Sequence, residues 1–267
     1  MSRLSTNDQT ALIATAHAMA DAARSVTLRH FRQPLAADNK DAAGFDPVTQ
    51  ADRDAERAMR DVLAQMRPQD TIIGEEYGTT TGTSGLTWVL DPIDGTRGYI
   101  SGTPTWGVLI GLRDADDALL GVIDQPYIGE RFIGGFGRAQ VEGPHGRAPL
   151  RTRAARSLDH ATIFTTFPEV GTPPEGAAFA ALAAHCRLTR YGMDCYAYAL
   201  LASGQIDLVV EAGLHPYDIL GPLGVVQAAG GIVTDWRGGP ALDGGRVIAA
   251  ANADIHAQAL AHLKAVA

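Results

Sequence analysis

The stretch WVLDPIDGT, residues 88–96, carries the strongest structural information in this chain. Three apolar residues, which favour a buried strand, lead directly into two aspartates three positions apart. Pro92 is expected to break the strand, and Gly95 permits the backbone to approach a ligand closely. A helix turn beginning at Gly95-Thr96 would turn free N–H groups towards a phosphate. The stretch therefore predicts a strand that leads into an acidic, phosphate-binding site.

Further carboxylates are expected to join this site. They also lie next to short apolar strands, and together the acidic set comprises Glu75, Glu76, Asp91, Asp94 and Asp218. Carboxylates gathered in a partly buried site repel one another and lose hydration, so they stay ionised only when cations join them. Oxygen ligands favour Mg²⁺ or Mn²⁺. Taken alone, the aspartate pair would be a turn or a helix cap and Glu75-Glu76 a solvated loop, but their conjunction favours a metal site.

Several common catalytic patterns are missing from the sequence. The two aspartates stand three positions apart, whereas aspartyl-phosphate enzymes carry DxDxT with a spacing of two. The chain has neither a GxxxxGK[ST] loop nor a GxSxG elbow, which argues against a nucleotide-driven kinase and a serine hydrolase. Water activated by a metal remains the economical nucleophile.

Composition excludes several classes of protein. With 46% hydrophobic and 19% charged residues, the 267-residue chain is of ordinary globular type. Thirty acidic residues against 22 lysines and arginines give a net charge of −8, which disfavours nucleic acid and anionic membranes as partners. The only two cysteines, Cys186 and Cys195, have no metal-binding or disulfide spacing, and no targeting segment is evident. We expect a cytoplasmic protein whose mature chain starts near Met1.

The chain divides into two halves with different rhythms. Residues 1–146 predict helices at 6–31 and 50–66 and a largely antiparallel sheet with strands at 71–74, 88–90, 106–112, 118–123 and 131–136, and this half carries most of the acidic set. The tract 79–87 is expected to be a flexible loop and a candidate lid. Gly143 to Arg147 marks the boundary. Residues 147–267, which carry Asp218, predict an α/β unit with strands at 162–167, 188–191, 206–211 and 231–236 and helices at 176–186, 196–203 and 219–229.

These motifs together resemble the signatures of the inositol-monophosphatase-like family. The likeness is carried by Gly74-Glu75-Glu76, residues 88–96, the segment from Tyr217-Asp218 to Gly231, and residues 46–52, in matching order and spacing. It extends over almost the whole chain. The resemblance implies a layered αβαβα sandwich of the sugar-phosphatase type. It also implies Mg²⁺-dependent hydrolysis of a phosphomonoester by water, with no covalent intermediate.

The resemblance also implies roles for individual residues. Two or three Mg²⁺ ions, for which Mn²⁺ is a possible substitute, would be bound by Glu75, Asp91, the carbonyl of Ile93, Asp94 and Asp218. Glu75 and Thr96 would orient the attacking water, with Asp52 in support. Asp94, Gly95 and Thr96 would hold the phosphate. The region of Lys40 would approach the entrance, and a homodimer is usual in the family.

Departures from the typical pattern indicate a branch of that family. Arg97 follows Gly95-Thr96, Pro216-Tyr217-Asp218 replaces the usual Cys-Trp-Asp, and residues 91–111, 192–199 and 207–218 look most like the histidinol-phosphatases. The implied substrate is L-histidinol phosphate, a small phosphorylated metabolite of histidine biosynthesis. Its ammonium group and imidazole would pair with Asp194 and Glu211. Arg190 and Arg97 are further candidate contacts.

Alternatives stay open at this point. Asp194 would equally serve as a cap for the helix at 195–203, Glu211 as a solvated carboxylate and Arg97 as an exposed cation. His215, His185 and Trp106 receive no catalytic role. An inositol-1-phosphatase or a broad sugar-phosphatase would use the same chemistry on another leaving group. A non-catalytic module that binds metal or a phosphorylated partner ranks lower, because every expected ligand is intact.

Overall fold

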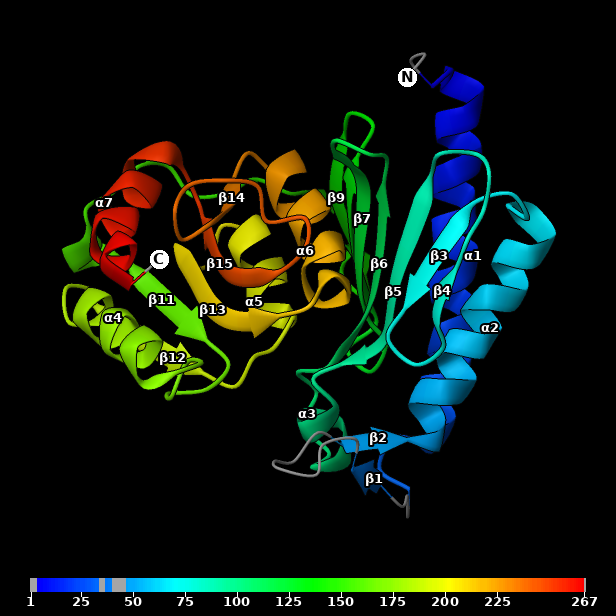
Figure 1. The fold of residues 1–267 in the computed structure, drawn as a ribbon, viewed down its shortest axis with the longest axis horizontal. Helices are drawn as coiled ribbons and strands as arrows, with labels where there is room; N and C mark the ends of the chain where they lie inside the picture. Colours follow the sequence, from blue (N-terminus) through cyan, green and yellow to red (C-terminus); the bar gives the residue numbers. More distant parts are fainter. Residues whose placement is uncertain (1–3, 34–36, 40–46, 267) are drawn as a thin grey trace.

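The computed structural model describes residues 4–33, 37–39 and 47–266. Its layers alternate, with two helices, an eight-stranded sheet, two central helices, a five-stranded sheet and two outer helices following one another (Figure 1). The predicted αβαβα sandwich is therefore confirmed. None of the described helices combines the length and the apolar character needed to cross a bilayer.

The first helical layer consists of α1 (Thr6–His30) and α2 (Gln50–Met66). Each begins at a capping box, in which Ser5 pairs with Asp8 and Thr49 pairs with Asp52. The apolar face of both helices packs on the eight-stranded sheet, where Met19, Met59 and Trp88 are fully buried. Both predicted helices are thus confirmed, and the second has its predicted cap. A short pair of strands, β1 (Ala37–Asn39) and β2 (Pro47–Thr49), precedes α2.

The eight-stranded sheet has the order β10-β9-β8-β7-β6-β5-β3-β4 and is antiparallel except where β3 pairs with β5. Its strands are β3 (Thr71–Gly74), β4 (Gly78–Thr80), β5 (Thr87–Asp94), β6 (Gly107–Arg113), β7 (Ala118–Gln125), β8 (Glu130–Gly135), β9 (Arg138–Gly143) and β10 (Gly146–Pro149). The helix α3 (Thr96–Ile100) follows β5, as the sequence predicted for the turn after Gly95.

Three expectations about this half need correction. Pro92 does not end its strand, because β5 continues to Asp94, and the proline falls where the ladder to β6 is interrupted and no N–H is required. Part of the tract 79–87 forms β4, and the Gly82 N–H donates to the Thr71 hydroxyl at 2.9 Å. The boundary predicted at 146/147 falls inside the β9–β10 hairpin, so the first sheet extends to Pro149. The division into halves otherwise stays a prediction.

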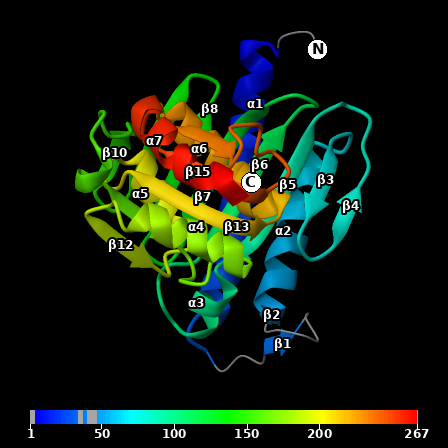
Figure 2. The same cartoon turned by 60° about the vertical axis from the view of Figure 1, so that its left-hand side comes forward.

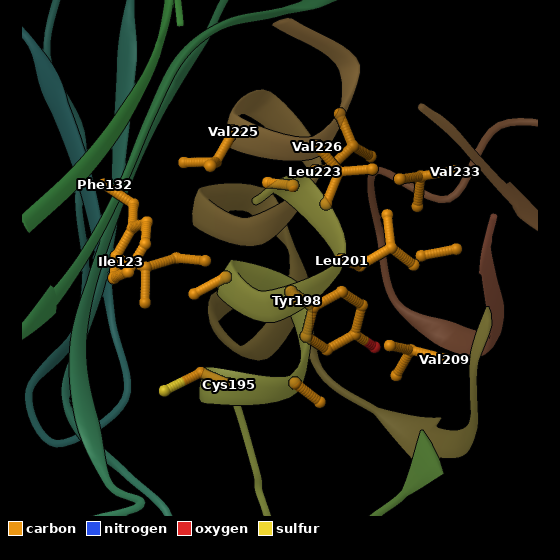
Figure 3. Packing of buried hydrophobic residues seen from close by; sticks show 14 of the residues in the cluster. Ile123, Phe132, Cys195, Tyr198, Leu201, Val209, Leu223, Val225, Val226 and Val233 are labelled. Atoms are coloured by element: carbon orange, nitrogen blue, oxygen red, sulfur yellow. The ribbon is translucent and has the colours of Figure 1, made fainter. Parts of the chain in front are cut away.

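The central layer is formed by α5 (Tyr196–Ala202) and α6 (Pro216–Ala228), which lie between the two sheets (Figures 1 and 2). Figure 3 shows Val225 of α6 pointing towards Ile123 and Phe132 of the first sheet, whereas Leu223 and Val226 lie on the opposite side of α6, towards Val233 and Leu201. Glycines let α6 approach the sheet closely, since a Cβ on Gly121 would lie 2.0 Å from the Gly221 carbonyl oxygen. This close packing sets where the first turn of α6 meets the end of β5.

The five-stranded sheet is mixed and has the order β12-β11-β13-β15-β14. Its strands are β11 (Thr162–Thr165), β12 (Leu188–Tyr191), β13 (Leu208–Leu214), β14 (Ile232–Asp235) and β15 (Gly245–Ala250), and α4 (Pro173–Ala183) and α7 (Ala253–Leu263) cover its outer face. The predicted α/β alternation is confirmed, although β15 and α7 were not anticipated. Short 3₁₀ turns at Leu158–His160 and Lys264–Val266 are the remaining helical elements of the described residues.

Candidate active site

A cavity of about 340 Å³ opens where β5, β11, β13 and the starts of α3 and α6 converge. Most of the residues singled out by the sequence line it. The lining comprises Glu75, Asp91, Ile93, Asp94, Gly95, Thr96, Arg97, Thr166, Phe167, Asp194, Glu211, Ala212, Gly213, Leu214, His215, Tyr217 and Asp218. The cavity therefore joins the predicted metal ligands with three of the predicted leaving-group contacts, Asp194, Glu211 and Arg97.

Three carboxylates form the floor of the cavity. Asp91, Asp94 and Asp218 each offer an oxygen, and these three oxygens lie within 4.8 Å of one another, the one such cluster among the described residues. Asp91 and Asp94 come from the irregular end of β5, where the Ile93 N–H donates to Asp91 Oδ1 at 3.0 Å. Asp218 comes from the first turn of α6, where it accepts from the His215 N–H at 2.6 Å. Local backbone donors thus hold two of the three carboxylates in place.

The electrostatics of this cluster favour a bound cation. Burial raises the pKa of Asp91 well above its usual range, and the charges of Glu75, Asp94 and Asp218 raise it further. Burial also raises the pKa of Asp94, with Asp194 and Asp218 adding to the effect. Burial and mutual repulsion thus disfavour the charged form of these carboxylates, whereas a divalent cation would favour it. An oxygen-only donor set fits Mg²⁺ or Mn²⁺, so the residues present suit the metal implied by the resemblance.

Glu75 reaches the cluster from the end of β3. Its backbone N–H donates to the Leu90 carbonyl at 3.2 Å, and its side chain is hydrogen-bonded to Asp91. The turn behind it is held by Glu56, a fully buried residue of α2 that accepts from the Glu76 N–H at 2.7 Å and pairs with Arg60. Sequence reasoning missed Glu56. Its signal was a carboxylate on the apolar face of α2, four positions before an arginine.

Thr96 and Asp52 lie together beside the cluster. The Thr96 hydroxyl is 3.1 Å from the Ile93 carbonyl and 3.4 Å from Asp52 Oδ1. Asp52 is buried and is itself fixed at the start of α2, where it accepts from the N–H and the hydroxyl of Thr49. Gly95 has φ +83°, and a Cβ there would lie 2.9 Å from Asp194. These contacts place the predicted water-orienting and phosphate-binding residues together, and their roles stay predictions.

The leaving-group side of the cavity holds Asp194 and Glu211. Asp194 adopts a left-handed backbone, φ +46°, and the N-cap of α5 is Cys195 with no side-chain cap, so nothing supports the helix-cap alternative. Burial raises the pKa of Asp194 to about 6, against the lowering effect of the Thr105 hydrogen bond and of Arg97. Burial likewise raises the pKa of Glu211 to about 7. Glu211 is 7% exposed, which contradicts the solvated alternative.

The structure does not bring every predicted residue to this cavity. Arg190 lies exposed on β12 and is not part of the lining, so its contact with substrate has no structural support. Lys40 lies outside the described residues. Conversely, His215 lines the cavity, although no role was predicted for it from the sequence. Its ring stacks on that of Tyr217, with 5.0 Å between the ring centroids. Its place at the end of β13, just before Asp218, could have indicated this.

Comparison with known proteins identifies the family. The model of the inositol monophosphatase family matches residues 8–267. The chain belongs to the inositol monophosphatase family. A solved inositol monophosphatase from Zymomonas mobilis is 39% identical, with a TM-score of 0.84 over 98% of this chain and 100% of that one. Enzymes of this family are metal-dependent phosphatases of small phosphorylated substrates, and this family member is such a phosphatase.

Two sequence relatives of this inositol monophosphatase family member bear on its substrate. The bifunctional phosphatase IMPL2, chloroplastic, of Arabidopsis thaliana is 39% identical over 98% of this chain and 78% of its own length. A histidinol-phosphatase of Chlorobaculum parvum is 34% identical over 88% of this chain and 89% of its own. Because these relatives are named for different phosphatase activities, membership of the family does not by itself identify the substrate.

Proposed function

We propose that this protein is a Mg²⁺-dependent histidinol-phosphatase, which converts L-histidinol phosphate and water to L-histidinol and phosphate in histidine biosynthesis. The observation that carries the proposal is the position of Asp194 and Glu211 in the same cavity as the carboxylate cluster. Two carboxylates in this cavity, the buried Glu211 and the partly buried Asp194, suit a leaving group that bears an ammonium and an imidazole. An inositol ring carries no charge to compensate them.

The proposed reaction is an in-line attack of water on phosphorus, with rupture of the ester P–O bond and transfer of a proton to the leaving alkoxide. Mg²⁺, held by Glu75, Asp91, the Ile93 carbonyl, Asp94 and Asp218, would lower the pKa of the water and neutralise the phosphoryl oxygens. The Thr96 hydroxyl donates its one proton to the Ile93 carbonyl or to Asp52 Oδ1. Its oxygen is therefore free to accept a hydrogen bond from the attacking water. Glu75 accepts the other O–H, and the Gly95 and Thr96 amides hold the phosphate.

An inositol-1-phosphatase is the second candidate. It is favoured by the 39% identity to the Zymomonas mobilis inositol monophosphatase. A broad sugar-phosphatase would share the metal chemistry, and a non-catalytic module is disfavoured by the complete acidic cluster. The homodimer and the cytoplasmic location are retained as predictions.

Phosphate release from the purified protein tests the proposal. Four substrates are compared at equal concentration with Mg²⁺, with Mn²⁺ and with a chelator: L-histidinol phosphate, myo-inositol 1-phosphate, fructose 1,6-bisphosphate and 3′-phosphoadenosine 5′-phosphate. We expect strong preference for L-histidinol phosphate and no release with the chelator. A flat profile, or preference for inositol phosphate, would keep the phosphatase and remove the histidinol assignment.

A further inference from the structure

We propose that the segment Thr165-Thr166-Phe167, where β11 ends, determines the specificity for the leaving group. In this proposal Thr166 positions Glu211, and Phe167 contacts a flat, N–H-bearing ring. The inference rests on the proposed function, because it states how the same cavity distinguishes an imidazole from a polyol.

Hydrogen bonds from this segment hold both carboxylate oxygens of Glu211. Oε1 accepts from the Thr166 N–H at 2.7 Å and from the Thr166 hydroxyl at 2.9 Å, and Oε2 accepts from the Thr165 hydroxyl at 3.1 Å. A carboxylate has about four lone-pair positions, so one position remains for a donor in the cavity. The segment therefore presents Glu211 as an oriented acceptor, and it fixes the side chain in the bound geometry before substrate arrives.

Phe167 adds an aromatic surface beside this acceptor. It is 44% exposed, lines the cavity, and has the Arg97 guanidinium 4.8 Å from its ring centroid. A partly exposed phenylalanine in a cavity wall offers apolar surface to a ligand, beside the Arg97 guanidinium that lies over its ring. Phe167 directly follows Thr166, which donates to Glu211, and both Phe167 and Glu211 line the same cavity.

An acceptor and an aromatic face together select a particular class of leaving group. A planar ring with an N–H, such as imidazole, can donate to Glu211 and at the same time stack on Phe167. A polyhydroxylated ring can donate to Glu211 but has no flat π face. Phe167 is thus expected to separate these two classes of substrate, while Thr166 supports the donor contact.

The test uses Thr166→Val and Phe167→Leu, with Thr166→Ser and Phe167→Tyr as conservative rescues. Tyr191→Leu is the matched control, because Tyr191 is another exposed aromatic on the same sheet, at 44%, that lies outside the cavity. KM and kcat are measured for L-histidinol phosphate and for glycerol phosphate, which lacks a ring. Binding of L-histidinol alone is measured by calorimetry, and melting temperatures show whether each variant is folded.

We expect Thr166→Val to raise the KM for L-histidinol phosphate about tenfold, the loss typical of a hydrogen bond to a charged group, with the KM for glycerol phosphate nearly unchanged. Phe167→Leu should weaken L-histidinol binding about fivefold. Thr166→Ser and Phe167→Tyr should keep wild-type values, and Tyr191→Leu should match the wild type throughout.

Equal changes for both substrates, or no change in L-histidinol binding, would overturn the inference while leaving the proposed function intact, provided that the wild type hydrolyses L-histidinol phosphate. A wild-type protein that does not hydrolyse this ester would overturn the proposed function, and the inference with it. If Thr166→Val does not fold, Phe167→Leu decides, since Phe167 is 44% exposed and lies outside the hydrophobic core.

Discussion

The backbone N–H of Cys195 donates a hydrogen bond to Asp94 Oδ2 at 2.6 Å, across 101 positions of sequence. Asp94 ends β5 in the eight-stranded sheet, and Cys195 precedes α5 in the central layer. The bond therefore ties a predicted metal ligand to the loop that carries Asp194. The proposed metal site and the proposed leaving-group pocket are therefore joined by this contact.

Asp91→Asn should abolish hydrolysis without unfolding the chain. The amide removes a buried charge crowded by Glu75, Asp94 and Asp218, while its oxygen can still accept from the Ile93 N–H. In a chelator the melting temperature should equal or exceed that of the wild type, and added Mg²⁺ should stabilise the wild type more than the variant. Retained turnover by the variant would refute the metal assignment.

Asp194→Asn should raise the KM for L-histidinol phosphate about tenfold and leave that for glycerol phosphate within about twofold, because only the first ester has a cationic leaving group. Asparagine tolerates the left-handed backbone at this position, φ +46°, so folding should persist. Steady-state kinetics on both esters provide the check, with Asp194→Ala in parallel. Equal losses on the two esters would remove Asp194 from specificity.

Glu175→Gln should destabilise the protein at neutral pH by about 1 kcal/mol, the usual contribution of a helix cap. Hydrogen bonds from Thr172, together with Arg246, lower the pKa of Glu175 from 4.5 to about 2. Because the pKa of Glu175 is lower in the folded than in the unfolded state, its ionised carboxylate stabilises the fold above pH 4.5. This stabilisation is lost as the pH falls towards 2. Urea unfolding of the wild type and of Glu175→Gln should therefore give unfolding free energies that differ less at pH 3 than at pH 7. The same difference at both pH values would contradict this account of the cap.

Gly121→Ala should cost about 3 kcal/mol of unfolding free energy, because the new Cβ would collide with the Gly221 carbonyl and push α6 from the sheet. Gly137→Ala is the comparison, since it has φ +75° but open space, and should cost about 1 kcal/mol. Because α6 carries Asp218, the Gly121 variant should also lose activity. Similar stability losses in the two variants would show that contact with α6 is not the cause.

Local signals in the sequence predicted much of this molecule. Apolar periodicity identified α1 and α2, Thr49 was the predicted cap of α2, and the strand before Asp91 was clear from its composition. The β9–β10 hairpin was missed because its strands are largely solvent-facing and its turn at Gly143 to Gly146 is also typical of a linker. The prediction that Pro92 ends its strand was wrong because the hydrogen-bond ladder between β5 and β6 is interrupted at the proline.

The acidic cluster was predictable because its members stand beside recognisable apolar strands. The hydrogen bonds to Glu211 were not predictable, because Thr165 and Thr166 contact it across 46 and 45 positions, with no local pattern to reveal the pairing. Glu56 likewise acts on a turn 20 positions later in the chain. Such contacts depend on the tertiary arrangement of the sheets and helices.

The central claim, recognition of histidinol as the leaving group, is tested most directly by competition. Equimolar L-histidinol phosphate and myo-inositol 1-phosphate are mixed in one Mg²⁺-containing reaction and followed by phosphorus NMR, so that their relative rates of consumption give the ratio of kcat/KM. The account predicts that L-histidinol phosphate is consumed about 100-fold faster, as expected when buried polar groups select a substrate. Equal consumption, or earlier loss of the inositol ester, would contradict it.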